Sequence, residues 1–184
     1  MADRLAGKRI AFLLANSGVE EVELVRPWEA LQAEGAETVL VAPEVGTVQA
    51  FEGDTDEAGT YEATLAVADA DPATFDGLVL PGGTTNPDTL RLHAPAVELV
   101  RAMTAAGKPV ASICHGPWTL VEAGVVGGKT LTSWPSLQTD IRNAGGTWVD
   151  EEVFTCPAEG WDLVTSRKPD DLDAFIAAAV ELFG

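Results

Sequence analysis

The sequence is poor in the residues that build disulfide frameworks or contact nucleic acid. It has two cysteines, two histidines and one tyrosine, and only 11 lysines and arginines against 29 aspartates and glutamates. Two cysteines in 184 residues do not form a disulfide framework, which favours free thiols in a reducing, cytoplasmic setting. The formal net charge of −18 repels phosphate backbones and anionic lipid head groups. We therefore expect neither nucleic acid nor a membrane as a partner.

Long apolar runs and cofactor signatures are missing too. No stretch approaches the ~18 apolar residues of a membrane span. The run Ile10–Ala15 is too short, and too closely followed by acidic residues, to be a signal peptide. No cysteine–histidine pattern has zinc spacing, and the glycines form neither a Walker nor a dinucleotide-binding motif, so we expect no metal and no cofactor. The length and the 46% apolar content predict a single domain over residues 1–184.

Short buried runs alternate with amphipathic stretches along the chain. Strands are predicted at 8–15, 37–42, 75–80, 109–113, 147–155 and 161–166, and helices at 20–34, 95–106, 116–123, 135–144 and 169–183. A kink or a broken first turn is expected at Pro27, and residues 47–66 are predicted to be irregular with short strands. The alternation indicates an α/β fold with a mostly parallel sheet and helices on both faces. Ligands bind outside the carboxyl ends of such strands.

The most informative segment is Pro109–Pro117, in which an apolar strand runs directly into Cys114 and a helix begins at once. Such a strand–cysteine–helix elbow exposes a nucleophile at the sheet edge, and the positive end of the helix favours thiolate over thiol. Gly116 lets the turn form. Free cysteines are usually buried structural residues, and Cys156, in a polar turn, is interpreted as a bystander. For Cys114, the adjoining His-Gly-Pro favours a nucleophile instead.

Other candidate groups follow neighbouring strands. Gly82 and Gly83 end one strand, where backbone N–H groups could form an oxyanion hole, although two glycines after a strand are often only a turn. Glu20 follows the first strand and could hydrogen-bond the Cys114 sulfur or shuttle a proton. The alternative for Glu20 is an acid that the helix dipole favours at a helix N-terminus.

His115 is the candidate general base, and it needs an acid to orient it. The candidate acid is Asp88, in the loop after the two glycines, acting within the chain or from another subunit; a solvated loop acid is the equal alternative. Trp118 follows the elbow closely and could wall the site. His93 precedes a predicted helix and is expected to be a surface or capping residue.

These motifs resemble those of the PfpI family, within the superfamily of the Parkinsonism-associated protein deglycase. The resemblance rests on SICHGPW at 112–118, LPGG at 80–83 and NSGVEEVELVRPWEAL at 16–31, and it extends through 131–153 and 162–172. It implies a flavodoxin-like three-layer sandwich of the class I glutamine amidotransferase type, and a homodimer or larger homo-oligomer. It also implies that Cys114 is the family's reactive, oxidation-prone cysteine.

The resemblance further implies roles for the other candidates. Glu20 matches the protonated glutamate that hydrogen-bonds the cysteine, His115 the adjoining histidine, and Gly83 a donor of the oxyanion site. Asp88 falls, after a one-residue shift, where some members carry a glutamate donated across the subunit interface. Glutamine amide transfer is not expected, because no histidine follows His115 to complete that triad.

Three functions fit the sequence. In a cofactor-independent deglycase or glyoxalase, Cys114 attacks the carbonyl of a reactive aldehyde or glycated adduct, backbone N–H groups stabilise the oxyanion, and Glu20 moves protons. In a non-enzymatic redox-sensing or chaperone-like stress protein, Cys114 is oxidised and Glu20 hydrogen-bonds the product. An intracellular cysteine peptidase, acting on peptide substrates, needs a complete unit of Cys114, His115 and an acid.

Overall fold

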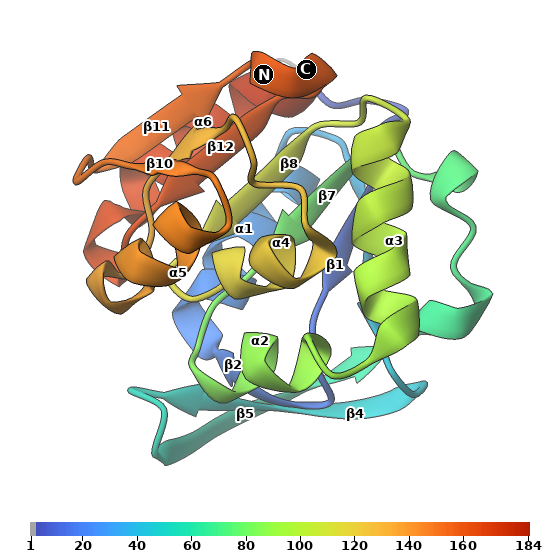
Figure 1. Cartoon of the computed structure of the whole chain (residues 1–184). Coiled ribbons are helices and arrows are strands. Elements are labelled where there is room, and N and C mark those ends of the chain that lie inside the picture. Colours follow the sequence, from blue (N-terminus) through green and yellow to red (C-terminus); the bar gives the residue numbers. More distant parts are fainter. Residues whose placement is uncertain (1–2) are drawn as a thin grey trace.

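Seven strands form the central sheet of the computed structural model, which describes residues 3–184 (Figure 1). The strand order is β11-β12-β8-β7-β1-β3-β6, and all neighbours are parallel except β11 and β12. These strands are β1 (Arg9–Leu13), β3 (Glu37–Ala42), β6 (Leu65–Ala66), β7 (Gly77–Leu80), β8 (Val110–Ile113), β11 (Val153–Cys156) and β12 (Leu163–Ser166). The prediction of a mostly parallel sheet is confirmed.

The sheet is buried on both faces, as its apolar strands require. Within β1, Ala11 and Leu13 pack into one hydrophobic core, whereas Ile10 and Phe12 pack into a second one. Successive side chains of a strand point to opposite faces, so a strand that is apolar at every position needs cover on both sides. The buried runs in the sequence therefore predict helices on both faces.

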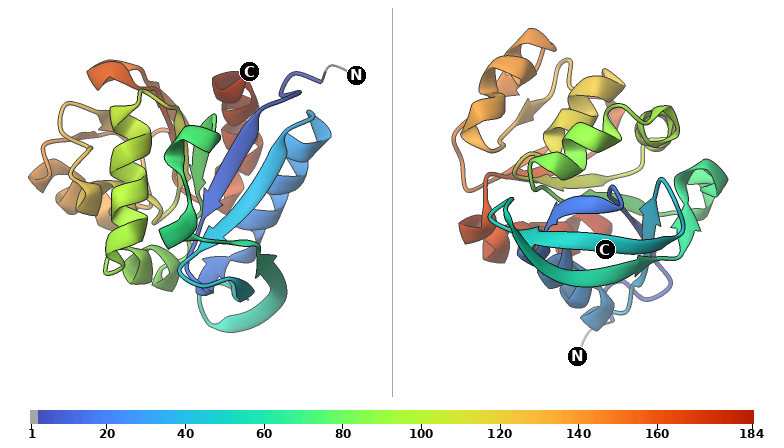
Figure 2. Two further views of the ribbon diagram at one scale, coloured as in Figure 1. Left: turned by 90° about the vertical axis from the view of Figure 1, so that its right-hand side faces the viewer. Right: turned by 90° about the horizontal axis from the view of Figure 1, so that it is seen from below.

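Helices cover the two faces and give the three layers that Figure 2 shows. One face carries α1 (Glu21–Ala33) and α6 (Leu172–Phe183), which pack against each other. The other carries α2 (Thr85–Leu90), α3 (Ala94–Ala105), α4 (Pro117–Ala123) and α5 (Gln138–Asn143). Short 3-10 turns lie at Val67–Asp69, Pro72–Thr74, Pro135–Leu137, Ala158–Gly160 and Pro169–Asp171. The predicted three-layer α/β sandwich is confirmed.

Helix α1 shows which side chains its spacing brings into the interior. Its buried residues are Glu23, Leu24, Pro27 and Leu31, and they recur at the three- and four-residue intervals of one helical face. The helix continues through Pro27, so of the predicted kink or broken first turn the break does not occur. The buried face of α1 therefore carries one carboxyl, that of Glu23, toward the sheet.

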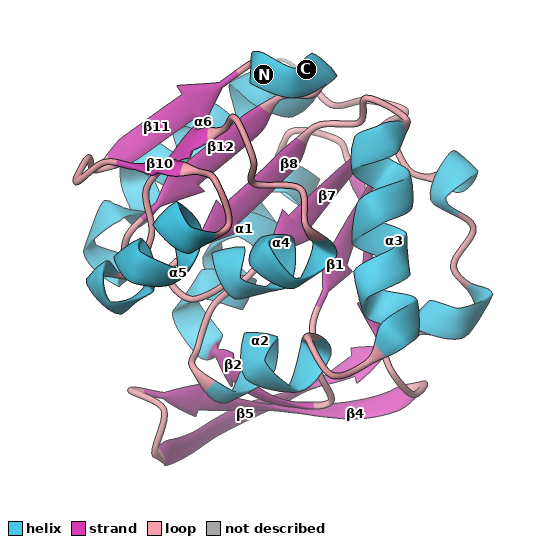
Figure 3. Cartoon of the chain, viewed as in Figure 1, coloured by secondary structure: helices cyan, strands magenta, loops and turns pink. Residues whose placement is uncertain are grey.

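A second, three-stranded sheet lies along the lower edge of the molecule in Figures 1 and 3, beside α2. It consists of β2 (Ser17–Glu20), β4 (Gly46–Glu52) and β5 (Asp56–Ala63). Strands β4 and β5 form an antiparallel hairpin with one register shift between Gln49 and Phe51, where the sequence predicts irregular structure with short strands. Val48 and Ala50 are buried at alternate positions of β4, whereas the tip of the hairpin at 53–55 is exposed.

Two further segments differ from the prediction. Residues 85–90, expected to be a loop, form α2. Residues 147–155 divide into β10 (Thr147–Trp148), which pairs with β9 (Thr130–Leu131), and β11 of the central sheet. The acidic residues 150–152 between β10 and β11 are exposed, and the chain leaves the sheet there. Among residues 3–184, no helix is long and apolar enough to cross a membrane.

The core beneath α6 can be tested with one large side chain. Phe175 is fully buried against the sheet, so we expect Phe175→Ala to lower the free energy of unfolding by about 3–5 kcal/mol. Leu92, which is 85% exposed, is the control, and Leu92→Ala should change stability by less than about 0.5 kcal/mol. Chemical denaturation measures both. Equal midpoints for the two variants would contradict the assigned packing.

Candidate active site

Cys114 occupies a sharp turn between β8 and α4. Its φ is +60°, in the left-handed region, where a residue other than glycine costs about 1 kcal/mol. Backbone hydrogen bonds hold the turn, because Cys114 N donates to Ser166 O at 3.0 Å and Trp134 N donates to Cys114 O at 2.9 Å. A Cβ at Gly116 would lie 2.4 Å from Leu80 O, so only glycine fits there. This is the strand–cysteine–helix elbow that the sequence predicts.

The carboxyl that faces the Cys114 thiol is that of Glu23. It is fully buried, and its Oε2 accepts a hydrogen bond from Gly82 N at 2.9 Å. Burial, together with the nearby charge of Glu20, raises the pKa of Glu23 from 4.5 to about 8. The carboxyl is therefore protonated at neutral pH and interacts with the cysteine sulfur as a neutral group.

This geometry corrects the role predicted for Glu20. Glu20 ends β2, is only partly buried, and accepts a hydrogen bond from Gly53 N at 3.0 Å, so its carboxyl faces the β4–β5 hairpin. The two glutamates are three residues apart, and both lie near the start of α1. Only Glu23 lies on the buried face that also carries Pro27 and Leu31. Helical spacing from those two residues is the signal that could have identified it.

His115 lies beside the thiol and is enclosed by two indole rings. Its Nδ1 is 3.2 Å from Cys114 Sγ. The ring is 5.2 Å from that of Trp118 and stacks on that of Trp134 at 5.6 Å, measured between centroids. Trp118 thus walls the site as predicted, and Trp134, which no motif marked, does so too. Burial lowers the pKa of His115, which favours the neutral imidazole that can accept a proton.

The thiol itself is held in its neutral form. Burial is the largest effect and raises the pKa of Cys114, whereas the backbone N–H groups of His115 and Gly83 lower it. Desolvation therefore acts against the thiolate that the helix N-terminus favours, and ionisation of Cys114 by the helix stays a prediction. A base is needed to ionise the thiol, and Nδ1 of His115 is in contact with it.

The two glycines after β7 have different tasks. The N–H groups of Gly83 and His115 point at the cysteine sulfur, where they can stabilise a negative charge. Gly82 N instead binds Glu23, so Gly82 holds the acid and is not free as an oxyanion donor. Gly83 has a φ of +78°, and a Cβ there would lie 2.3 Å from Gly18 O. Both conditions require glycine at position 83.

Asp88 does not join this constellation within the chain. It lies in the first turn of α2 with an exposed side chain. Among residues 3–184, no carboxylate hydrogen-bonds to His115. The acid whose charge acts on His115 is Asp54, from the tip of the β4–β5 hairpin. No sequence motif marked Asp54, because a long hairpin connects it to the site.

Cys156 and His93, which the sequence did not assign to the site, lie away from Cys114. Cys156 is buried at the end of β11, where its Sγ accepts a hydrogen bond from Thr130 N at 3.3 Å. His93 directly precedes α3 and makes no side-chain capping bond.

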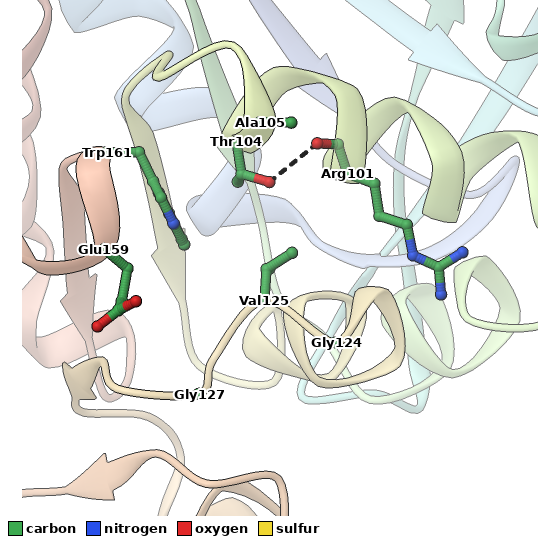
Figure 4. Close-up of a pocket in the computed structure, with 8 residues that line it drawn as sticks. All are labelled: Arg101, Thr104, Ala105, Gly124, Val125, Gly127, Glu159 and Trp161. Atoms are coloured by element: carbon green, nitrogen blue, oxygen red, sulfur yellow. Dashed lines mark hydrogen bonds between the residues drawn. The ribbon is translucent and has the colours of Figure 1, made fainter.

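A surface hollow of about 410 Å³ lies at the opposite edge of the sheet from Cys114, among α3, the loop after α4 and the residues before β12 (Figure 4). Its lining contains no cysteine or histidine. The Arg101 guanidinium at its rim donates to the carbonyl of Ala123 at 2.9 Å and pairs with Glu98. We therefore place the candidate active site at Cys114 and not in this hollow.

Taken together, the fold and the elbow define an α/β protein with a buried cysteine between a strand and a helix, and comparison with known proteins identifies its family. The sequence model of the DJ-1/PfpI family matches residues 8–182, so the chain belongs to the DJ-1/PfpI family. This confirms the resemblance on which the prediction rests.

Similar proteins agree with this assignment. Deglycase PfpI from Pyrococcus furiosus is 40% identical over 174 residues, which cover 95% of this chain and 98% of that protein. Protein/nucleic acid deglycase 2 from Escherichia coli is 36% identical over 178 residues, covering 96% and 98%. The crystal structure of DJ-1beta from Drosophila melanogaster superposes with a TM-score of 0.82 at 27% identity, covering 100% of this chain and 92% of that one. The class predicted from the sequence, a deglycase-type protein, is confirmed.

The raised pKa of Glu23 makes stability depend on pH. A glutamate in the unfolded chain ionises near pH 4.5, whereas Glu23 in the folded chain ionises near pH 8. The stabilisation that comes from burying the neutral Glu23 carboxyl is therefore fully present below pH 4.5 and is lost as the pH rises to about 8. Glu23→Gln carries no such proton. We expect the stability of the variant relative to the wild type to rise by about 4 kcal/mol over this range. Denaturation at pH 4.5 and pH 8 measures it.

The exposed Glu57 is the matched control for this experiment, and Glu57→Gln should follow the wild type at both pH values. If Glu23→Gln shows the same pH dependence as the wild type, Glu23 is not a buried neutral acid.

Proposed function

We propose that the protein is a cofactor-independent deglycase of the glyoxalase type, which acts on small reactive carbonyls and on the adducts that they form with amines. The observation that carries the proposal is the 3.2 Å contact between the buried Cys114 thiol and the buried His115 imidazole, with two N–H groups aimed at the sulfur. This arrangement suits addition of a thiol to a carbonyl, because the imidazole removes the thiol proton as the carbon–sulfur bond forms.

The first step converts an aldehyde such as methylglyoxal into a hemithioacetal. Nδ1 of His115 takes the Cys114 proton, Sγ bonds to the aldehyde carbon, and the carbonyl electron pair moves to oxygen. The N–H groups of Gly83 and His115 stabilise that oxygen before it is protonated. With an amine adduct, the same attack breaks the carbon–nitrogen bond, and the proton held by His115 leaves with the amine.

The later steps need two proton shifts and one water molecule. One shift moves a proton from the sulfur-bearing carbon to the neighbouring carbonyl carbon, and the other moves the hemithioacetal hydroxyl proton to the former carbonyl oxygen, which together give a thioester of a 2-hydroxy acid. The neutral His115 and the protonated Glu23 flank the sulfur and can exchange these protons. Water then hydrolyses the thioester, which regenerates the thiol. Methylglyoxal and water give lactate, so the reaction consumes no oxidant, reductant or cofactor.

The two other functions that fit the sequence have weaker support. A redox sensor works best with an ionised, accessible thiolate, whereas the pKa of Cys114 is raised and the residue is 6% exposed. A peptidase needs an acid that orients the histidine, and Asp88 is exposed and away from His115 within the chain. That Asp88 of a neighbouring subunit orients His115 stays a prediction.

Such a role for Asp88 needs a homo-oligomer. The apolar side chains of Val22, Trp28 and Tyr61, partly exposed on α1 and β5, support one.

Charge around the site supports a preference for neutral or cationic substrates. Glu20 and Asp54 act electrostatically on Glu23, and Asp54 also acts on His115, within a chain of net charge −18. Adducts on arginine or lysine side chains fit this field, whereas adducts on nucleotides are anionic and are repelled. The Escherichia coli relative is named a protein/nucleic acid deglycase, but we propose that this chain disfavours adducts on nucleic acid. We also propose a cytoplasmic location, where free thiols persist.

The nucleophile is tested by comparing the two cysteines. Cys114→Ser should lower methylglyoxal consumption without glutathione by at least about 10³-fold, because the hydroxyl is a far weaker nucleophile. Cys156→Ser is the control and should keep more than about half of the activity. Lactate formation by the reduced proteins is the measurement. Activity of Cys114→Ser equal to that of the wild type would refute the proposal.

The substrate preference is tested with two adducts of the same aldehyde. We expect kcat/KM to be about 10-fold higher for the methylglyoxal adduct of N-acetylarginine than for that of guanosine monophosphate, as ~1.4 kcal/mol of electrostatic discrimination gives. The difference should shrink as salt is raised. A preference for the nucleotide adduct, or one independent of salt, would show that charge does not select the substrate.

A further inference from the structure

The tip of the β4–β5 hairpin is fastened to the loop that carries the Gly83 N–H donor. Asp54 Oδ1 accepts a hydrogen bond from Thr84 N at 2.7 Å, and Asp54 Oδ2 accepts one from Thr84 Oγ1, also at 2.7 Å. The neighbouring Gly53 N donates to Glu20 Oε2 at 3.0 Å. The hairpin tip thus joins the end of β2 to the start of α2, which lie beside it in Figure 1.

Both partners of this contact give up a locally favoured arrangement to make it. Asp54 has a φ of +68°, in the left-handed region, where it shares with Cys114 and Glu159 a conformation that costs about 1 kcal/mol. Thr84 occupies the N-cap of α2, where its side chain makes no capping bond and its hydroxyl donates to Asp54 instead. Such a strained, exposed turn points to a function for the contact and not to core packing.

The contact acts directly on the backbone of the oxyanion site. Thr84 follows Gly83, whose left-handed conformation glycine can readily leave, since it has no Cβ to restrict it. On one side, Gly83 is packed so closely against Gly18 O that a Cβ would lie 2.3 Å from it. On the other, two hydrogen bonds to one carboxylate fix the next residue, Thr84. Together they hold the Gly83 N–H toward the Cys114 sulfur.

We propose that Asp54 is a positioning residue for the oxyanion site, and that the pair of bonds from Asp54 to Thr84 forms a latch that aims the Gly83 N–H at the reacting atoms. The inference rests on the proposed carbonyl chemistry of Cys114. It assigns a role to the β4–β5 hairpin, which otherwise lies outside the three-layer sandwich.

The electrostatic effect of Asp54 is the competing explanation. Its charge also opposes the lowering of the His115 pKa by burial. The two explanations separate on substitution, because Asn keeps both hydrogen bonds and loses the charge. The Asn oxygen can accept from Thr84 N, and its amide can donate to Thr84 Oγ1. Ala loses the bonds and the charge together.

The experiment compares Asp54→Ala, Asp54→Asn and Thr84→Ala with Glu57→Gln, which removes an acid of the same hairpin outside the latch. Steady-state kinetics with methylglyoxal should show kcat about 10–100-fold lower for Asp54→Ala, with KM changed less than about 3-fold, because the donor acts mainly in the transition state. Asp54→Asn should stay within about 3-fold of the wild type, Thr84→Ala should fall between them, and Glu57→Gln should be unchanged.

A second readout does not depend on turnover of a carbonyl. Because the aimed N–H stabilises the thiolate, alkylation of Cys114 by iodoacetamide at fixed pH should be at least about 3-fold slower in Asp54→Ala and near the wild-type rate in Asp54→Asn. This readout tests the latch even if the wild type converts no methylglyoxal, a result that would reject the proposed function alone.

Two results would overturn the latch. One is wild-type kcat and alkylation in Asp54→Ala. The other is equal impairment of Asp54→Asn and Asp54→Ala, which would show that the charge of Asp54 matters and its hydrogen bonds do not. If Asp54→Ala does not fold, Thr84→Ala and Asp54→Asn decide, and a Thr84→Ala variant indistinguishable from the wild type contradicts the proposal.

Discussion

A carboxyl buried without a cationic partner is the constraint on which the rest of the site depends. Glu23 reaches the interior because it shares a helical face with Leu24, Pro27 and Leu31, whose burial fixes α1 on the sheet. A charged carboxylate in that place would cost far more than its single backbone hydrogen bond returns. The group therefore stays protonated, and its neutrality decides how the neighbouring thiol behaves.

The protonated carboxyl of Glu23, the buried thiol of Cys114 and the buried imidazole of His115 then lie together at the elbow. Burial disfavours charge on each of them, so charge develops there mainly when a substrate accepts the thiol. The left-handed turn at Cys114 and the aromatic rings beside His115 keep the reacting atoms in contact during that change. The N–H groups are already oriented, so they stabilise the developing negative charge without having to reorganise. A resting thiol of this kind is also protected from chance oxidation, because the thiolate is the reactive species.

The fold was predictable because it depends on patterns that are local in the sequence. Apolar runs and the breaks between them indicated the parallel sheet, and the run of an apolar strand into Cys114 indicated the elbow. Glu23 was not identified as the acid beside Cys114, because Glu20 and Glu23 both lie near the start of α1 and only the phase of the helix separates them. The different contacts of the Gly82 and Gly83 N–H groups were not predicted, because they depend on which N–H faces Glu23. The burial that opposes the helix-dipole effect at Cys114 was not foreseen, because it depends on how neighbouring segments pack over the thiol.

Residues that reach the site from distant segments could not be identified in this way. Asp54 lies 30 residues before its partner Thr84, in a stretch whose polar composition suggested irregular structure. Trp134 reaches His115 across the fold, and its spacing matches no motif. Such contacts are created by topology, through the hairpin that crosses the end of the sheet and the loop that returns over α4.

The most direct test of the account is the protonation state of Glu23. The carbon-13 resonance of its side-chain carboxyl, assigned by comparison with Glu23→Gln, can be followed by NMR from pH 4 to pH 10. We expect the Glu23 carboxyl to titrate with a midpoint near pH 8, far above that of an exposed glutamate. A midpoint near 4.5 would show an ionised carboxylate beside the thiol at neutral pH, and the neutral site described above would be wrong.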